Sequence, residues 1–412
     1  MRYDLLIKGA HVVDPGSGVD EVRSVAISRG RVSAVDWAIP EESAFEVVDA
    51  SGLYLTPGFV DLHTHIYTGA TFWGIAPDPI AARTGVTTWV DAGSAGALNF
   101  DGFRDTVARR SLVTVREWLN ISCIGLTAHD YELSVPGFID GSVFELVASA
   151  NRDIVVGGKV RMGASTVGPT GTFALEEARR ALDRLGLPMM VHIAQPPPEP
   201  EGFQALLRAG DVVTHCCTAQ GMRLVNREGG LRDFAKIWRD RGVLFDVGHG
   251  TGSFDFAVAE ALVANDLIPD FISSDLHQNS VDGPAYDLPT CVTKWLALGM
   301  ELTDAIGKVT IGPARYLGMD HEIGSLAVGK RADIALFALE SGARTLYDSS
   351  WTTRTSIRTL VHHKTYLMGR EMKALADVPR PEFLAWKRGG RDDTLRANQL
   401  RFNGRVDRGD RA

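Results

Sequence analysis

Two histidines spaced two residues apart, His63 and His65, carry the clearest chemical signal in the sequence. The apolar, β-branched run that precedes them favours a buried strand. Side chains two residues apart on a strand point to the same face. Both imidazoles can therefore bind one metal ion, because imidazole nitrogen is a common ligand for zinc and its neighbours. Taken in isolation, the pair fits two solvated histidines at the start of a loop equally well.

Four further candidates each come directly after, or at the end of, another short apolar run: His192, His215, Asp275 and the lysine Lys159. We expect His63, His65 and Asp275 to bind one ion, because a site needs about four to five ligands. His192 and His215 would bind a second ion from two neighbouring strands.

Two cations held roughly 3.5–4 Å apart need a bridging anion between them. No aspartate or glutamate stands at the end of the fourth expected strand, where Lys159 is found instead. A plain ammonium would be repelled strongly by two metal ions. Carbamylation by carbon dioxide would turn the lysine into a long-armed carboxylate, and we therefore expect N6-carboxylysine at Lys159.

The surrounding pattern predicts the elements that must position these residues. Short apolar runs alternate with helical stretches at a spacing of roughly 25 to 35 residues, which is typical of repeated strand–helix units. Helices are expected at 175–185, 255–265 and 287–298. Eight such units close into an α/β fold, the (β/α)8 TIM barrel, whose chemistry lies at the carboxyl ends of its strands. The eight strands are predicted to end near His65, Asp91, Gly125, Arg161, His192, His215, Gly248 and Asp275.

Both ends of the chain have a β-rich texture that is too short to bury a core alone. We expect residues 1–57 and 320–378 to form one small β-sandwich domain around a catalytic barrel at 58–319. The range 379–412 is rich in Arg, Asp and Gly, and fits either an arm over a neighbouring subunit or a tail.

Composition limits the class of protein. The 412 residues are 45% hydrophobic and 23% charged, as in ordinary globular enzymes. The formal net charge of −8 argues against nucleic acid or an anionic membrane as a partner. The charged first residues do not resemble a secretion signal, and the four cysteines lack the spacing of a disulfide framework. We therefore expect a cytoplasmic enzyme with a small-molecule substrate, compatible with a homo-oligomer.

The order His-x-His, Lys, His, His, Asp on such a barrel resembles the amidohydrolase superfamily. More narrowly, it resembles the branch with two metals bridged by a carboxylated lysine, which includes dihydroorotase, dihydropyrimidinase and D-aminoacylase. The resemblance covers about residues 1 to 375 and includes the phrases at 56–65, 84–88 and 324–333. The segments 158–162 and 246–250 are most similar to the dihydroorotase-like amidohydrolase/deacetylase group, which is associated with hydrolysis of acylated small acids such as O-acetylated α-hydroxy acids.

The resemblance implies a hydrolase that cleaves an amide or ester bond of an N-acyl amino acid or an O-acyl α-hydroxy acid. Its cofactors would be two divalent ions, zinc or else manganese, cobalt or iron. A hydroxide held between the ions would attack the substrate carbonyl. Asp275 would accept the proton and return it to the leaving group.

Substrate-binding residues are expected near the strand ends. Arg161 lies two residues beyond Lys159, so strand alternation directs it to the same mouth, where it would clamp a carboxylate or form an ion pair at the rim. His249 follows the seventh strand and would contact the substrate. Weaker candidates, each of which also fits a packing role, are Tyr67, Tyr131, Ser165, Gln195 and His277.

Three alternatives remain open. A cyclic amidohydrolase of the dihydroorotase or hydantoinase type would use the same ligands. A mononuclear deaminase on this barrel typically needs a glutamate three residues after a ligand histidine, but Gln195 follows His192 and Thr218 follows His215 at that spacing. A non-catalytic scaffold predicts missing ligands, and the sequence retains all of them.

Overall fold

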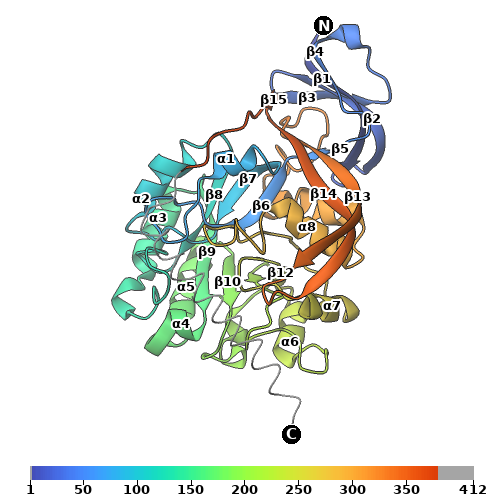
Figure 1. The fold of residues 1–412 in the computed structure, drawn as a ribbon. Helices are drawn as coiled ribbons and strands as arrows, with labels where there is room; N and C mark the ends of the chain where they lie inside the picture. Colours follow the sequence, from blue (N-terminus) through green and yellow to red (C-terminus); the bar gives the residue numbers. More distant parts are fainter. Residues whose placement is uncertain (1, 379–412) are drawn as a thin grey trace. The chain divides into compact units, whose positions relative to one another are not determined.

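A curled sheet of seven parallel strands forms the wall of the barrel (Figure 1). The computed structural model describes residues 2–378, so the expected arm or tail at 379–412 lies outside the described residues. The strands pair in chain order, each hydrogen-bonded to the next. Their bounds are β6 Phe59–Thr64, β7 Val86–Asp91, β8 Thr114–Asn120, β9 Val155–Met162, β10 Met189–Ile193, β11 Val212–Thr214 and β12 Leu244–Asp246.

The eighth position of the barrel is filled by residues 271–276, which form no continuous strand. Phe271 pairs with Asp246 and Leu276 pairs with Thr64 through isolated parallel bridges. This segment therefore joins β12 to β6 and closes the ring. The (β/α)8 class is confirmed, although the sequence predicted a full strand here and placed the end of β8 near Gly125 instead of Asn120.

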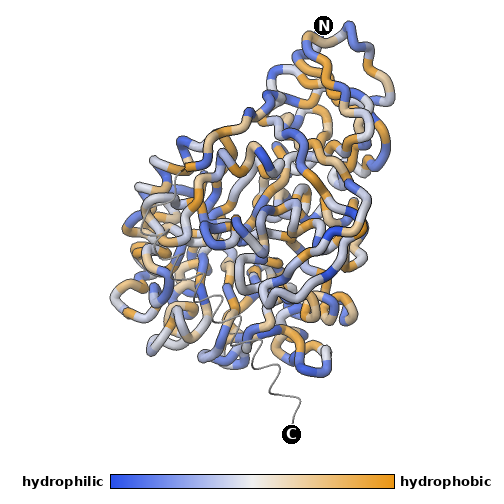
Figure 2. Tube along the Cα trace, viewed as in Figure 1, coloured by the Kyte–Doolittle hydropathy of each residue, from blue (hydrophilic) through white to orange (hydrophobic). Residues whose placement is uncertain are grey.

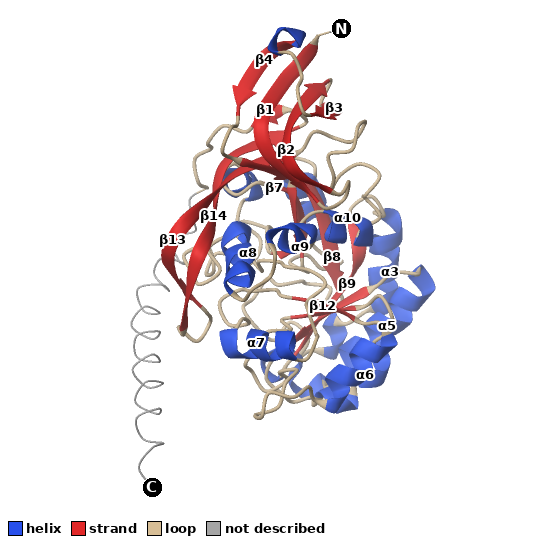
Figure 3. Cartoon of the chain, turned by 90° about the vertical axis from the view of Figure 1, so that its right-hand side faces the viewer, coloured by secondary structure: helices blue, strands red, loops and turns tan. Residues whose placement is uncertain are grey.

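The three helices predicted from the sequence are present as α5 (Phe173–Leu185), α7 (Phe256–Ala264) and α8 (Leu288–Ala297). The Asp255 carboxylate accepts from Val258 N before α7, and Asp287 likewise caps α8 at Thr290 N. Figure 3 shows α3, α5 and α6 on the outside of the barrel strands. The remaining helices are α1 Pro77–Ala81, α2 Phe100–Phe103, α3 Gly141–Ala150, α4 Ala164–Val167, α6 Asp233–Arg241, α9 Leu302–Gly307 and α10 Ile311–Tyr316.

A second, mainly antiparallel sheet is assembled from both ends of the chain, in the order β15-β14-β13-β5-β1-β2-β3, with β4 beside β1. Its strands fall within the two terminal ranges expected for the small domain, and hydrophobic and hydrophilic segments alternate along them in Figure 2. The strand bounds are β1 Tyr3–Asp14, β2 Val19–Ser28, β3 Arg31–Asp36, β4 Ala44–Asp49, β5 Tyr54–Pro57, β13 Ile334–Tyr347, β14 Thr353–Leu367 and β15 Arg370–Glu371.

Among the described residues, the two largest apolar cores lie in the barrel and in the terminal sheet. The larger fills the space between the barrel strands and their helices, with Trp89, Trp238 and Trp295 fully buried. The smaller lies in the terminal sheet, around Ile7, Val25 and other aliphatic side chains. None of the described helices has the length and apolar composition needed to cross a lipid bilayer.

Candidate metal centre

The six predicted metal ligands line one cavity of about 190 Å³ at the carboxyl ends of the barrel strands. They come from five places around the ring, so only the closed barrel brings them together. The contributing segments are the end of β6 with the residue after it (His63 and His65), β9 (Lys159), β10 (His192), the residue following β11 (His215) and the closing segment (Asp275).

His63, His65 and Asp275 form a compact group of ligand atoms. Oδ1 of Asp275 lies 3.4 Å from Nε2 of His63 and 3.2 Å from Nε2 of His65. One ligand atom from each residue lies within 4.8 Å of the other two, which suits a single metal ion. Asp275 adopts a φ of +46°, an uncommon backbone conformation for a residue other than glycine, and its N–H donates to the His63 carbonyl at 2.8 Å.

The other half of the site contains His192, His215 and Lys159. Nδ1 of His192 lies 2.7 Å from Nε2 of His215, so both ring nitrogens face the same space. Nζ of Lys159 lies 3.2 Å from Nε2 of His63. The lysine is 1% exposed, and within residues 2–378 it forms no ion pair. A buried amine among neutral imidazoles is an unusual arrangement for a purely structural lysine.

The outward nitrogen of three of these histidines is held by another group of the barrel, which fixes the ring and turns the other nitrogen into the cavity. The contacts join His63 Nδ1 to Thr214 Oγ1 at 2.8 Å, His65 Nδ1 to Ser94 Oγ at 3.0 Å, and His215 Nδ1 to the Gly248 carbonyl at 2.7 Å. Thr214 in turn donates to Oδ2 of Asp246 at 2.7 Å. The donor set is therefore oriented as a metal site requires.

Burial sets the protonation of the ligands. It lowers the pKa of His65 to about 3 and that of His215 to about 4, and it lowers the pKa of His63 and of His192 well below the usual value. The imidazoles are consequently neutral near pH 7, which is the form that binds metal. Burial also lowers the pKa of Lys159 to about 7. Four neutral nitrogens and a carboxylate fit divalent zinc, manganese, cobalt or iron.

Arg161 also lines the cavity, from the same strand as Lys159. Its Nε lies 3.5 Å from Oε1 of Glu132, and its Nη2 lies 3.6 Å from Oδ1 of Asp130. The Arg161 guanidinium therefore faces the cavity and also has acidic neighbours at long range, and the carboxylate clamp stays a prediction. These distances leave room for closer, paired contacts with an incoming carboxylate.

Three other predicted substrate-binding residues do not line the cavity. The Tyr67 hydroxyl donates to the Asn99 carbonyl at 3.0 Å, and its ring packs on Phe103. Tyr131 is 63% exposed. His249 is fully buried and turns towards α8. The expectation of substrate contact therefore has no support from the positions of these side chains.

Among the weaker candidates, Ser165 and His277 line the cavity, whereas Gln195 accepts a hydrogen bond from Gly221 N at 3.1 Å and is not part of the lining. Sequence reasoning missed Trp73, whose ring lies 4.7 Å from that of His277, and Gln220. Both stand in loops without hydrophobic periodicity, so no pattern marked them.

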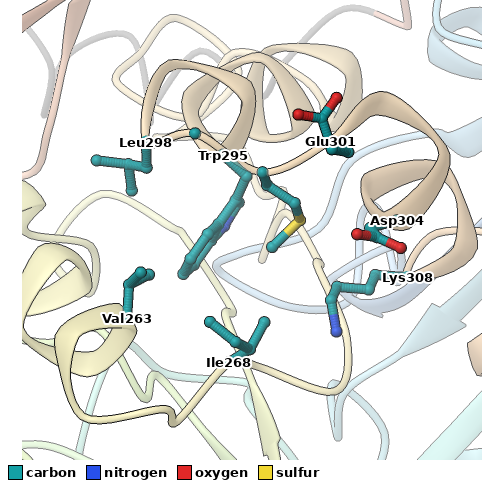
Figure 4. A pocket seen from close by; sticks show the side chains of 9 residues that line it. Val263, Ile268, Trp295, Leu298, Glu301, Asp304 and Lys308 are labelled. Carbon is teal, nitrogen blue, oxygen red and sulfur yellow. The ribbon is translucent and has the colours of Figure 1, made fainter.

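A second cavity, of about 380 Å³, lies beside α8 and α9 and shares no lining residue with the first. Figure 4 shows the indole of Trp295 on one side and the side chains of Glu301, Asp304 and Lys308 on the other. It is the larger of the two. Among the described residues, however, the one group of side chains arranged so that it could hold a metal ion lies in the first cavity, which we therefore take as the functional site.

Comparison with known proteins places this geometry in context. The model of the amidohydrolase family matches residues 54–372, which include every candidate ligand. The chain belongs to the amidohydrolase family. It is 35% identical to a deacetylase of Agrobacterium fabrum over 354 residues, which cover 85% of this chain and 86% of that protein. Membership of this family and the similarity to a protein named deacetylase make this protein a hydrolase of the amidohydrolase superfamily.

Two solved structures are similar over nearly their whole length. A dihydroorotase crystal structure has a TM-score of 0.83 and 32% identity, covering 92% of this chain and 99% of that one. An adenine deaminase crystal structure has a TM-score of 0.82 and 34% identity, covering 90% and 99%. These relatives share the fold, but their names describe different reactions. The residues of the site are therefore the evidence for which reaction this protein catalyses.

Proposed function

We propose that this amidohydrolase is a metal-dependent deacylase, which hydrolyses the amide or ester bond of a small acylated carboxylic acid. The observation that carries the proposal is the convergence of four neutral histidines, Asp275 and a buried lysine on a cavity with Arg161 in its wall. The similarity to a protein named deacetylase over 85% of the chain supports the same class of reaction.

Two divalent ions fit the ligand set. His63, His65 and Asp275 would hold one ion, and His192 and His215 the other. Lys159 would join them after its Nζ has attacked carbon dioxide, forming an N–C bond and releasing a proton to give the carbamate. When bound, the ions supply a water of lowered pKa and an electrophilic site for a carbonyl oxygen.

The remaining steps belong to the side chains of this chain. Asp275 accepts a proton through its carboxylate and returns it to the leaving oxygen or nitrogen. Arg161 binds the carboxylate of the substrate by paired hydrogen bonds and thereby orients the acyl group. Because the ligands are almost completely buried, their charges interact more strongly than charges at the protein surface do.

Deamination is the less favoured reaction despite the adenine deaminase neighbour. Among the described residues that line the cavity, Asp275 carries the single carboxylate. Gln195 and Thr218 stand where the deaminase pattern has a glutamate, and neither an amide nor a hydroxyl replaces a carboxylate in proton transfer. Opening of a cyclic amide remains chemically close, because it cleaves the same type of bond.

The proposal is tested by metal content together with a substrate screen. We expect about two ions per chain and hydrolysis of N-acetyl α-amino acids or O-acetyl α-hydroxy acids, with one enantiomer preferred. Ring opening of dihydroorotate or hydantoins without deacylation would replace the deacylase with a cyclic amidohydrolase. One ion per chain with ammonia release from adenine would replace it with a deaminase. Absence of bound metal and of activity would indicate a scaffold.

A further inference from the structure

The structure contains a second buried lysine, Lys294 of α8, which the proposed reaction does not use. It is 1% exposed, and its Nζ donates to Nε2 of His249 at 2.6 Å and to the Pro284 carbonyl at 2.8 Å. Within residues 2–378 it forms no ion pair, so these two neutral acceptors are its hydrogen-bond partners. Burial of an ammonium without a carboxylate is costly, which indicates that the contacts serve a purpose.

Every polar atom of the His249 ring is engaged. Nδ1 lies 2.9 Å from the Gly250 carbonyl, which can only accept, so Nδ1 carries the proton and Nε2 accepts from Lys294. The ring also stacks on Phe254 at 4.7 Å between centroids. With 0% exposure, His249 presents no atom to a substrate. Its contacts instead fix the segment that follows β12.

That segment forms the wall beside Asp275. The N–H groups of His249 and Gly250 donate to the carbonyls of Ser273 and Ser274 at 3.3 and 2.9 Å. A Cβ added to Gly250 would lie 2.3 Å from Oδ2 of Asp275, and the φ of Gly250 is +51°. The backbone at Gly250 is therefore packed directly against the carboxylate, with no room for a side chain between them.

The same segment continues into the cavity, because Thr251, Gly252 and Ser253 line it. Lys294 also holds the Pro284 carbonyl, in the loop that follows Asp275 and His277. One ammonium thus connects the loop after β12, the loop after the closing segment and α8. Both loops flank the carboxylate that receives the proton in the proposed reaction.

We propose that Lys294 and His249 form a positioning pair, which holds the backbone of Gly250 against the Asp275 carboxylate and so fixes that carboxylate for proton transfer. The pair touches neither substrate nor metal, and its role rests on the proposed function. Loss of either member would release the backbone of the segment at 249–250 beside Asp275. Small misplacements of a catalytic group lower turnover by up to about 100-fold. KM and metal content stay close to those of the wild type.

The test compares His249→Leu, which removes both ring contacts, with His249→Gln, whose amide supplies one donor and one acceptor. We expect kcat to fall about 10- to 100-fold in His249→Leu and to recover partly in His249→Gln. Lys294→Met should lower kcat in the same range, and the double variant should lose less than the product of the two single losses, because the His249–Lys294 contact is already broken in each single variant. Lys308→Met is the matched control: this lysine donates to the Pro269 carbonyl at 2.6 Å away from the site, and its loss should leave kcat unchanged.

Three results would overturn the positioning role: unchanged kcat in Lys294→Met, a rise in KM at constant kcat, or additive losses in the double variant. Hydrogen–deuterium exchange of residues 248–253 gives a readout that does not depend on turnover. Faster exchange there in both His249→Leu and Lys294→Met supports the pair even if the wild type fails the substrate screen, and unchanged exchange contradicts it. If Lys294→Met does not fold, the difference in kcat between His249→Leu and His249→Gln tests the same positioning role.

Discussion

Nζ of Lys159 lies 3.2 Å from Nε2 of His63, although the two residues are 96 positions apart in the chain. Both side chains are 1% exposed. The strands that carry them, β9 and β6, are not neighbours in the barrel sheet, because β8 and β7 lie between them in the pairing order. Only the closed barrel can bring this amine and this imidazole together, and the proposed metal chemistry depends on that contact.

Thr214 orients His63, and its removal should weaken metal binding. Thr214→Val removes the 2.8 Å contact to Nδ1 of His63 and the 2.7 Å bond to Asp246. Loss of such a supporting group typically lowers metal affinity about 10- to 100-fold, which a competition titration with a chelator measures. Thr345→Val, at an exposed position of β13, is the matched control. Equal affinities in the two variants would show that Thr214 does not orient the ligand.

Asp275→Asn keeps an oxygen for the metal but removes the group that accepts a proton. We expect kcat to fall by about 10²- to 10⁴-fold at equal metal occupancy, as is usual for loss of a general base. Steady-state kinetics on protein of measured metal content tests this. Asp233→Asn, at a carboxylate whose side chain is 92% exposed, should leave kcat unchanged. Near-normal turnover in Asp275→Asn would remove this carboxylate from the proton transfer.

Arg161→Met should affect substrates with a carboxylate and spare those without one. Hydrogen bonds to a charged group contribute about 1.5–3 kcal/mol, so kcat/KM for an acylated acid should fall roughly 10- to 100-fold. The uncharged primary amide of the same substrate, measured on the same variant, serves as the control for changes in folding. An equal loss with both substrates would indicate that Arg161 acts through its ion pairs with Asp130 and Glu132.

The metal-free protein should lose stability as the pH falls below about 6.5. His65 and His215 have folded pKa values of about 3 and about 4, so between about pH 4 and 6.5 the unfolded chain binds protons that the folded chain does not. The free energy of unfolding therefore rises with pH in this window, by about 1.4 kcal/mol per pH unit for each histidine. Urea denaturation after chelator treatment measures the slope. His65→Asn should reduce it by about one proton, and an unchanged slope would contradict the assignment.

The ligand set could be anticipated from the sequence because strand geometry constrains it. A spacing of two on a strand places His63 and His65 on one face, and parallel strands in a barrel bring their carboxyl ends to one mouth. The closing segment was harder to anticipate, because residues 271–276 make only isolated bridges and end at an aspartate with positive φ.

Side chains in loops could not be placed in the same way. His249 follows a strand just as His215 does, yet it turns away because Lys294, 45 residues later, provides its partner. Tyr67 likewise finds the Asn99 carbonyl, and Trp73 reaches the cavity from a segment with no regular pattern. In each case a contact with a residue far away in the chain sets the orientation of the side chain. The sequence near that side chain does not reveal the contact.

The chemical state of Lys159 tests the central claim most directly. A crystal structure of protein prepared with divalent metal and bicarbonate, with anomalous data to locate the ions, resolves it. We predict a carboxylate group on Nζ that lies between two metal ions, with the four histidines and Asp275 as the other protein ligands. An unmodified amine at Lys159, beside one ion or none, would contradict the account.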